Sequence, residues 1–363
     1  RKDVIINDQS IYNVFLSQSS SFLEEVIVVG YGSQTKSTLT GAITSIDTES
    51  LVNSPNSSVA NVLSGKITGI STVQSSGQPG REDPAIYVRG LGSLTPGASS
   101  PLILVDGVER PFSQMDPNEI ESISVLKDAS ATAVFGVRGA NGVIMVTTRR
   151  GKKGAAKVSV TSSGGLQMPT RILETADSYT YATIHNEMRT NDNAIPVFSD
   201  YALERFRLKD EPIMFPDVNW TDYIMNKSSF QTQHNVNISG GSDDVRYFVS
   251  LGLLYQNGLF KQFPELDYDN NYNYRRYNYR TNLDLNITKT TTLNIGIGGI
   301  VGDIREPYNT YTHGPWYSML ITQPFSSPGI IDGKLIKNDI IFFQGIQLVT
   351  PLEHHYGRGT QSS

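Results

Sequence analysis

Cysteine is absent from the 363 residues of this chain. The absence excludes disulfides, thiol nucleophiles and cysteine-ligated metals. Charged residues make up only 18% of the chain and the formal net charge is −5, so nothing indicates a basic surface for nucleic acid. No long apolar run occurs, and no transmembrane helix is therefore predicted. A soluble protein and a β-barrel both remain open, because barrel strands are too amphipathic to register in hydropathy.

Catalytic motifs are missing as well. The five histidines show no metal-binding spacing, and neither a GxSxG motif nor a suitably spaced carboxylate pair occurs. The glycine-rich segment 136–142 follows a predicted helix and precedes a strand, the reverse of a nucleotide-binding loop, so it predicts a tight turn. In segment 267–273, Asp and Asn alternate like calcium ligands, but a solvated loop is favoured because the EF-hand glycine and glutamate are missing. We expect no enzyme, no cofactor and no metal.

The chain is rich in residues typical of β-structure and turns, with 32 glycines and 18 tyrosines. Between Ser37 and Arg150 the predicted elements are short and mixed, which indicates an α+β domain. The predicted strands are Gly41–Ile46, Ile67–Val73, Ala85–Arg89, Leu102–Val105, Ile123–Leu126 and Val143–Thr148. The predicted helices are Ser57–Leu63, a turn beginning at Asp116-Pro117, and Ala129–Phe135, with Asp116 and Asp128 as N-caps.

After Gly154 the pattern changes to long strands in which apolar and polar residues alternate. Such strands are predicted at His234–Ile238, Val245–Tyr255, Tyr277–Thr288 and Leu293–Val301. Alternation alone also fits a soluble sandwich with one face on a core. Two details favour an outer-membrane barrel: the connections alternate between short and long, and tyrosines cluster at strand ends, as in an aromatic girdle.

Several motifs resemble those of SusC/RagA-type TonB-dependent outer-membrane transporters. LEEVIVVGYG at 23–32 looks like their TonB-box region, and VLSGKITGI at 62–70 resembles a stretch of their plug. The strands at 84–90 (PAIYVRG) and 101–108 (PLILVDGV) are similar to central plug strands. The segment 120–148 matches the end of the plug, and VNISGGSDDVRYFVSLG at 236–252 resembles a first barrel hairpin. The motifs follow one another in the order of the family.

The resemblance implies a globular plug inside a barrel of 22 strands. This chain is expected to hold only the first strands of that barrel. We expect four parts. Residues 1–22 are the end of an immunoglobulin-like (carboxypeptidase-regulatory-like) β domain, and residues 23–36 are the TonB-box segment and a linker. Residues 37–152 are the plug domain, and residues 153–363 are the N-terminal portion of the barrel with its extracellular loops.

The function implied is TonB-dependent import of a large nutrient, most simply an oligosaccharide, with the plug gating the barrel. A peptide importer of the same family is one alternative, and a surface glycan-binding or adhesion protein without active transport is another. The partners implied are the periplasmic domain of TonB, a SusD-like surface lipoprotein and the lipid of the outer membrane of a Gram-negative, Bacteroidota-like bacterium.

Three groups of residues are candidates for these roles. An extended β-branched segment can add a strand to a partner's sheet, which makes Glu25, Val26, Ile27, Val28 and Val29 the candidate TonB-binding site. Charged plug residues can seat the plug in a displaceable, polar manner; these are Arg81, Glu82, Asp83, Arg89, Arg110 and Arg138. Aromatic residues in outer segments can stack on sugars or pack within loops; these are Tyr272, Tyr274, Trp316 and Tyr317.

Overall fold

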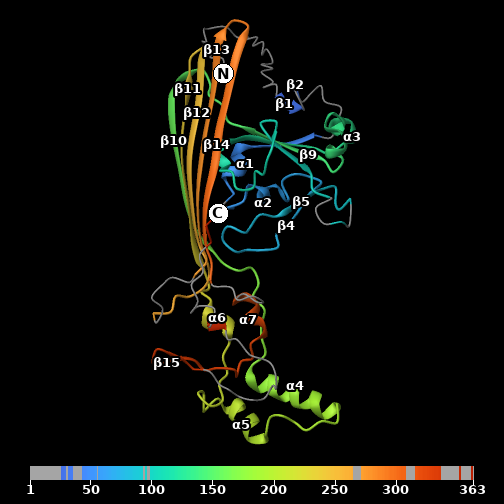
Figure 1. The fold of residues 1–363 in the computed structure, drawn as a ribbon, viewed down its shortest axis with the longest axis vertical. Helices are drawn as coiled ribbons and strands as arrows, with labels where there is room; N and C mark the ends of the chain where they lie inside the picture. The colour runs from blue at the N-terminus through green and yellow to red at the C-terminus, as the bar shows by residue number, and fades with distance from the viewer. Residues whose placement is uncertain are drawn as a thin grey trace, which may run out of the picture.

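Two bodies of secondary structure pack against each other (Figure 1). A tall antiparallel sheet, here called the wall, stands beside a mixed α+β domain, the plug. The computed structural model describes residues 26–29, 32–35, 43–54, 56–92, 95, 99–264, 271–307, 315–336, 351–352 and 361–362. Among these residues, no helix is both long and apolar enough to cross a membrane.

The plug is built on a five-stranded sheet in the order β3-β8-β9-β6-β7. Its strands are β3 (Ile43–Asp47), β6 (Leu102–Val105), β7 (Val108–Glu109), β8 (Ile120–Leu126) and β9 (Val143–Thr148). Only β6 and β9 pair in parallel; the other neighbours are antiparallel. The central strand β9 is apolar and almost wholly buried, as expected of a strand covered on both faces. A separate hairpin joins β4 (Ile70–Val73) to β5 (Ala85–Val88).

The tight connection between β6 and β7 follows from its sequence. Asp106 and Gly107 both have positive φ, +50° and +84°, the geometry that Asp-Gly adopts in a two-residue hairpin. The Asp106 carboxylate also accepts hydrogen bonds from the backbone N–H of Thr148 (2.9 Å) and from its hydroxyl (2.6 Å). The turn is thereby tied to the end of β9.

Short helices cover the plug sheet. They are α1 (Thr48–Val52), α2 (Val59–Leu63), η2 (Pro117–Glu119), α3 (Ala129–Thr132) and η3 (Ala133–Gly139). Asp116 caps η2, since its carboxylate accepts from the N–H of Asn118 at 2.8 Å. Asp128 makes no cap hydrogen bond and instead pairs with Arg89. The main apolar cluster, which includes Leu63, Phe112 and Ile144, is formed by plug residues alone among those described.

The wall is a sheet in the order β10-β11-β12-β13-β14-β17, antiparallel throughout. Its long strands are β10 (Gly154–Gln167), β11 (Ser229–Gly241), β12 (Val245–Asn257), β13 (Asn273–Thr288) and β14 (Thr291–Arg305), with β17 (Gln361–Ser362) at the edge. Four of the five long strands contain the strands predicted from alternation. Strand β10 was not predicted.

The wall is polar on the face that is buried and apolar on the face that is exposed. On β13 the polar residues Arg276, Asn278, Arg280 and Asn282 are all at most 4% exposed, whereas Tyr277 and Tyr279 are 49% and 45% exposed. On β12, Ser250 is buried while Leu251 is 59% exposed. A soluble sandwich would bury its apolar face. The opposite arrangement is that of a barrel wall with lipid outside and a polar interior.

Connections at one end of the wall are short and at the other end long. The turns at 242–244 and 289–290 are short, and Gly154 at the start of β10 pairs with Gly241 beside the first of them. The opposite end carries the connections 168–228 and 258–272 and the segment after Arg305. Outer-membrane barrels place short turns in the periplasm and long loops outside.

The long connections hold helices that were not predicted from the sequence. These elements are α4 (Ser178–Asn191), α5 (Asp200–Leu208), α6 (Trp220–Ile224) and α7 (Pro315–Ile321), with the hairpin β15 (Gly329–Ile331) and β16 (Lys334–Ile336). Figure 1 shows them beyond the wall and plug. Phe325, which follows α7, packs against Phe198 and Phe206 of the first connection at ring distances of 5.4 and 5.8 Å. The two connections therefore share one apolar cluster.

The interpretation of the long strands as a soluble sandwich is wrong, because their buried face is polar and their exposed face is apolar. Strand β4 begins at Ile70 rather than Ile67, because the chain turns at Gly69, whose φ is +80°. Segment 1–22, assigned to an immunoglobulin-like domain, lies outside the described residues, as do Asp267 and Asp269 of the alternative calcium loop. Among the residues that are described, no group of three or more His, Asp or Glu side chains could hold a metal.

Plug and wall approach so closely at Gly252 that a side chain would not fit. A Cβ on this residue of β12 would lie 2.5 Å from Oδ2 of Asp116, the residue that caps η2. We expect Gly252→Ala to push Asp116 aside and to destabilise the plug by roughly 1–3 kcal/mol. Hydrogen exchange at the amide of Asn118 should accelerate. Gly165→Ala on β10, where nothing lies within 4 Å of the new atom, is the control; equal exchange in both variants would contradict the close approach.

Candidate functional site

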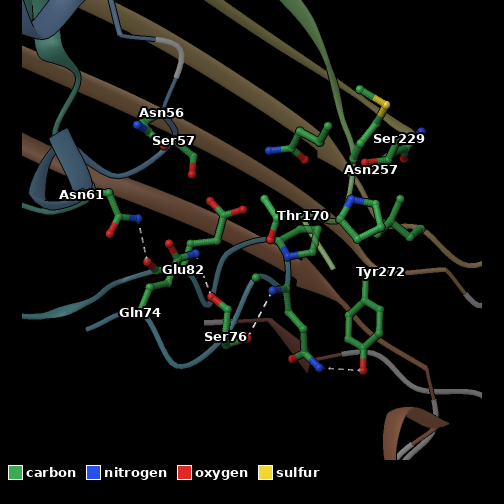
Figure 2. Close-up of a pocket in the computed structure, with 18 of the residues that line it drawn as sticks. Asn56, Ser57, Asn61, Gln74, Ser76, Glu82, Thr170, Ser229, Asn257 and Tyr272 are labelled. Atoms are coloured by element: carbon green, nitrogen blue, oxygen red, sulfur yellow. Dashed lines mark hydrogen bonds between the residues drawn. The ribbon is translucent and has the colours of Figure 1, made fainter. Parts of the chain in front are cut away.

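A cavity of about 890 Å³ lies between the plug and the long-loop end of the wall. Figure 2 shows Asn61 and Glu82 of the plug on one side of it and Asn257 and Tyr272 of the wall on the other. The plug side comes from the loop that joins β4 to β5 and from the start of α2, and the wall side comes from the ends of β10, β11 and β12. The cavity thus lies between the loop ends of the plug and those of the wall.

The lining is polar, with little charge. Amide side chains are the largest group: Asn56, Asn61, Gln74, Gln78, Gln167 and Asn257. Serine and threonine hydroxyls add further donors and acceptors, and Glu82 is the one carboxylate in the lining among the described residues. Amides and hydroxyls both donate and accept hydrogen bonds, so they suit a ligand rich in hydroxyl or amide groups.

Two aromatic residues complete one side of the cavity. Tyr272 is buried, and its hydroxyl accepts a hydrogen bond from Nε2 of Gln78 on the plug at 3.2 Å. Trp316 of α7 stacks near Tyr272, and its ring lies 5.0 Å from that of the fully buried Phe260. The rings are thus held by packing within the loops while they border the cavity.

Glu82 belongs both to the cavity and to the contact between plug and wall. Nε2 of Gln256, a buried residue of β12, donates to both of its carboxylate oxygens at 3.2 Å. Burial raises the pKa of Glu82 to about 7, although the hydrogen bond from Gln256 and the nearby charge of Arg276 act in the opposite direction. The carboxyl at the floor of the cavity is therefore poised between its neutral and charged forms near neutral pH.

Deeper along the wall, buried arginines of β13 bind the plug. The guanidinium of Arg280 donates from Nε to Oε2 of Glu119 at 3.1 Å and lies 3.5 Å from Oδ2 of Asp106. Arg276 donates to the backbone carbonyl of Ser57 at 2.9 Å. Burial raises the pKa of Glu119 to about 7, and the charge of Arg280 opposes that shift.

Uncharged side chains extend this contact. Asn278 donates to the carbonyl of Gln114 at 2.8 Å, and Asn282 donates to the hydroxyl of Thr148 at 2.8 Å. We call the whole set of contacts between the plug and β12–β14 the seam. The seam contains many hydrogen bonds and an ion pair, together with the buried ring of Tyr274, whereas the core of the plug is apolar.

Comparison with known proteins agrees with this architecture. A family model, the TonB-dependent Receptor Plug Domain, matches residues 35–143. TonB-dependent receptor P26 of Formosa agariphila is 33% identical over 270 residues, which cover 72% of this chain and 26% of that protein. TonB-dependent receptor SusC of Bacteroides thetaiotaomicron is 32% identical over 260 residues, 69% of this chain and 24% of SusC.

Solved structures show the same fold. A structure of the RagAB peptide transporter superposes with a TM-score of 0.63 at 26% identity, over 85% of this chain and 36% of that one. RagAB in the open-open state gives a TM-score of 0.68 at 24% identity, over 89% and 37%. The chain belongs to the SusC/RagA-type TonB-dependent receptors. It spans about a quarter of the length of the curated receptors that it matches. Membership places it in the outer membrane.

The structure distributes the charged plug residues of the receptor over different positions. Two of them contact the wall or the segment after it: Glu82 meets Gln256, and Arg81 pairs with Glu306 at 3.1 Å. Arg110 is half-buried, and its pKa is lowered by burial and by the neighbouring charge of Arg280.

The other charged plug residues bind partners within the plug. Asp83 accepts from Ser58 at 3.3 Å and from Gln114 at 2.9 Å. Arg89 pairs with Asp128, and Arg138 pairs with Glu109, both at the plug surface.

The structure places the four aromatic candidates in different surroundings. Tyr272 and Trp316 line the cavity. Tyr274 is buried at the seam, where its hydroxyl donates to Oε1 of Gln114 at 3.4 Å. Tyr317 is 45% exposed and does not line the cavity.

The candidate TonB-binding segment forms a strand in the receptor. Strand β1 (Val26–Val29) pairs with β2 (Gly32–Thr35) in a two-stranded antiparallel sheet, while Glu25 lies outside the described residues. In the described part of the chain, β2 is its one partner, so the second edge of β1 is unpaired there.

The seam residues of the wall were not predicted. Gln256, Arg276, Asn278, Arg280 and Asn282 occupy polar positions of the long strands, and no role was predicted for them. A signal was present, since arginine and asparagine alternate at every second residue from Arg276 to Asn282. In a barrel that face lines the interior, where the plug lies.

The raised pKa of Glu82 makes the stability of the plug depend on pH. A carboxyl with a raised pKa binds its proton more tightly in the folded plug than in the unfolded one, so plug stability falls as pH rises from about 4.5 to about 7. We expect Glu82→Gln to remove roughly 1–3 kcal/mol of this fall. Hydrogen exchange of the buried Val125 amide, followed between about pH 5 and pH 8, measures it. The exposed Glu187→Gln is the control, and an unchanged slope in Glu82→Gln would refute the assignment.

Proposed function

We propose that the receptor imports a large nutrient across the outer membrane in a TonB-dependent manner, with the plug gating the barrel. The observation that carries the proposal is the polar cavity on the long-loop side, whose floor is the plug itself. Cargo in this cavity has the plug between itself and the short-turn end of the wall. Passage therefore requires the plug to move.

The seam supports this gating role. Many of its contacts are hydrogen bonds and ion pairs, which water can replace when the plug is displaced. The apolar cluster of the plug lies within the plug, so displacement does not expose it. An apolar seam would resist the pull, because the exposed area would cost about 25 cal/mol per Å².

The lining favours an oligosaccharide as cargo. Amides and hydroxyls match the many hydroxyls of a neutral sugar chain, and Trp316 and Tyr272 provide aromatic rings on which a sugar can stack. The lining has no lysine or arginine among the described residues, so a strongly acidic cargo has no counter-charge there.

Replacement of the tryptophan tests the cargo. We expect Trp316→Ala to weaken oligosaccharide binding by about tenfold, or roughly 1.4 kcal/mol, because a packed aromatic platform is lost. The adjacent Tyr317→Ala, at an exposed position outside the cavity, is the matched control. Calorimetry with neutral oligosaccharides of increasing length provides the affinities. Equal losses in the two variants would count against sugar binding in this cavity.

A peptide is the second candidate cargo, and one observation favours it: the RagAB structures similar to this chain are of a peptide importer. The same amides can pair with a peptide backbone. Competition between a peptide pool and oligosaccharides for the purified receptor separates the two. A surface adhesin without transport would bind cargo equally well but would show no TonB-dependent uptake.

The proposed energy source is the periplasmic domain of TonB, bound at residues 25–29. The unpaired edge of β1 supports this proposal, since an extended partner strand can add to such an edge. The segment precedes the plug directly, so a pull on it acts on β3 first.

Proline at the centre of the segment tests the TonB contact. We expect Val28→Pro to abolish binding of the periplasmic domain of TonB, because proline removes a ladder donor. Val28→Thr retains both the N–H and the β-branch and should bind normally. Pull-down and cargo uptake are measured in parallel. Binding by the proline variant would reject residues 25–29 as the site while leaving the cavity untouched.

A SusD-like surface lipoprotein is the proposed lid over the long-loop end. The first long connection exposes apolar side chains: Ile184 and Met188 lie one turn apart on α4 with 51% and 57% exposed, and Ile195 beyond the helix is 83% exposed. Apolar groups gathered on an outer loop are typical of a surface that meets another protein.

A further inference from the structure

A second cavity, of about 330 Å³, lies at the opposite end of the receptor. It is bordered by the plug near α1, the start of β8 and the end of β9, and by the first residues of β10, the end of β11 and the start of β12. Gly154 and Gly240, which line it, adjoin the short turn at 242–244. It is therefore the counterpart of the cargo cavity on the periplasmic side.

The lining of this cavity holds more basic than acidic side chains. Five basic residues line it, namely Arg149, Arg150, Lys152, Lys153 and Lys157, against the single carboxylate of Glu121. Two of the five have partners elsewhere, since Arg150 pairs with Asp284 and Lys153 with Asp243 at 2.6 Å. Lys152 and Lys157 form no ion pair among the described residues. Arg149 is half-buried, and burial lowers its pKa while Glu121 raises it.

The uncharged lining supplies hydrogen-bond donors. Ser159 and Ser239 contribute hydroxyls, and Asn237 contributes an amide. Asn237 is only 4% exposed, and its side-chain oxygen has no hydrogen-bond partner in the described structure. This oxygen is an acceptor, so it can take a hydrogen bond from water or from the P–OH of a hydrogen phosphate, but not from an ionised phosphate oxygen.

The cavity lies on the inner side of the wall. Val158 and Val160 of β10 are 65% and 70% exposed on the outer face, and strand alternation turns Lys157 and Ser159 to the other side. The seam does not use these lysines, and the cargo cavity is at the far end of the strands. The basic cavity is thus separate from both.

We propose that this basic cavity binds a phosphate group. Clustered ammonium and guanidinium groups with adjacent hydroxyl and amide donors are the chemistry that recognises a phosphate oxyanion. Two sources carry that group on the short-turn side: soluble phosphate compounds of the periplasm and the headgroups of anionic phospholipids. The inner-side position gives soluble phosphate the direct approach, since lipid contacts the outer face of the wall. This inference is independent of cargo and of TonB.

Titration of the intact receptor tests the proposal. In a neutral, phosphate-free detergent, inorganic phosphate should bind saturably by calorimetry and more weakly as ionic strength rises. The double variant Lys152→Gln/Lys157→Gln should lose about tenfold or more in affinity. Lys289→Gln, at the other short turn and outside the cavity, should bind like the unaltered receptor. Lys152→Arg/Lys157→Arg keeps both charges and should retain binding, which separates loss of charge from loss of fold.

A second experiment distinguishes a soluble phosphate compound from a lipid headgroup as the source of the bound phosphate group. Receptor in nanodiscs of phosphatidylcholine, with or without phosphatidylglycerol, is assayed for bound lipid by native mass spectrometry. Lysine-dependent retention of phosphatidylglycerol without binding of inorganic phosphate assigns the cavity to a headgroup. Lysine-dependent binding of inorganic phosphate assigns it to soluble compounds. Binding in neither arm, or binding that the double glutamine variant leaves unchanged, overturns the proposal.

Discussion

Two arginines buried in strand β13 govern the relation between wall and plug. A guanidinium cannot lose its charge at accessible pH, so burial requires partners for it. Arg276 and Arg280 find theirs on the plug, at the carbonyl of Ser57 and the carboxylate of Glu119. The dependence is mutual at this ion pair, because Glu119 is itself only 3% exposed and has Arg280 as its partner. The apolar cluster of the plug, by contrast, is formed by plug residues alone among those described.

The contacts of the wall with the plug reach the cavity proposed for the cargo. Ser57 and Glu82 line the cargo cavity and at the same time hold Arg276 and Gln256 of the wall. A ligand that competes for the Glu82 carboxylate therefore acts directly on a contact of the seam. No relay through the plug core is required, because Glu82 both lines the cavity and accepts hydrogen bonds from Gln256.

The sequence predicted the elements whose patterns are local. Strands β6 and β9 were predicted with their observed ends, since each is an apolar run bounded by turn residues. The alternation of apolar and polar residues predicted β11 to β14. Strand β10 was missed because much of it consists of small residues, namely Gly164, Gly165 and four serines and threonines, which show no clear alternation of apolar and polar side chains. Helices α4 and α5 are polar and depend on the caps at Asp177 and Ser199, which were not recognised.

The site was less accessible to prediction. Glu82 was chosen for its charge alone, and its partner Gln256 lies 174 positions away. Trp316 was chosen for its aromatic ring, but only the fold distinguishes it from its neighbour Tyr317, because the two differ in the direction of their side chains and not in type. Arg89 and Arg138 resemble Arg81 in sequence and differ from it only in which body supplies the partner.

The shared cluster around Phe325 has a mechanical consequence. The connection after β10 and the segment after β14 leave the wall four strands apart, about 19 Å at 4.8 Å per strand. They meet again through the rings of Phe198, Phe206 and Phe325, through the carbonyl of Pro324, which accepts from the N–H of Val218 at 2.9 Å, and through that of Gln323, which accepts from the indole of Trp220 at 3.1 Å. These contacts therefore tie the outer end of β10 to that of β14, across the three strands between them.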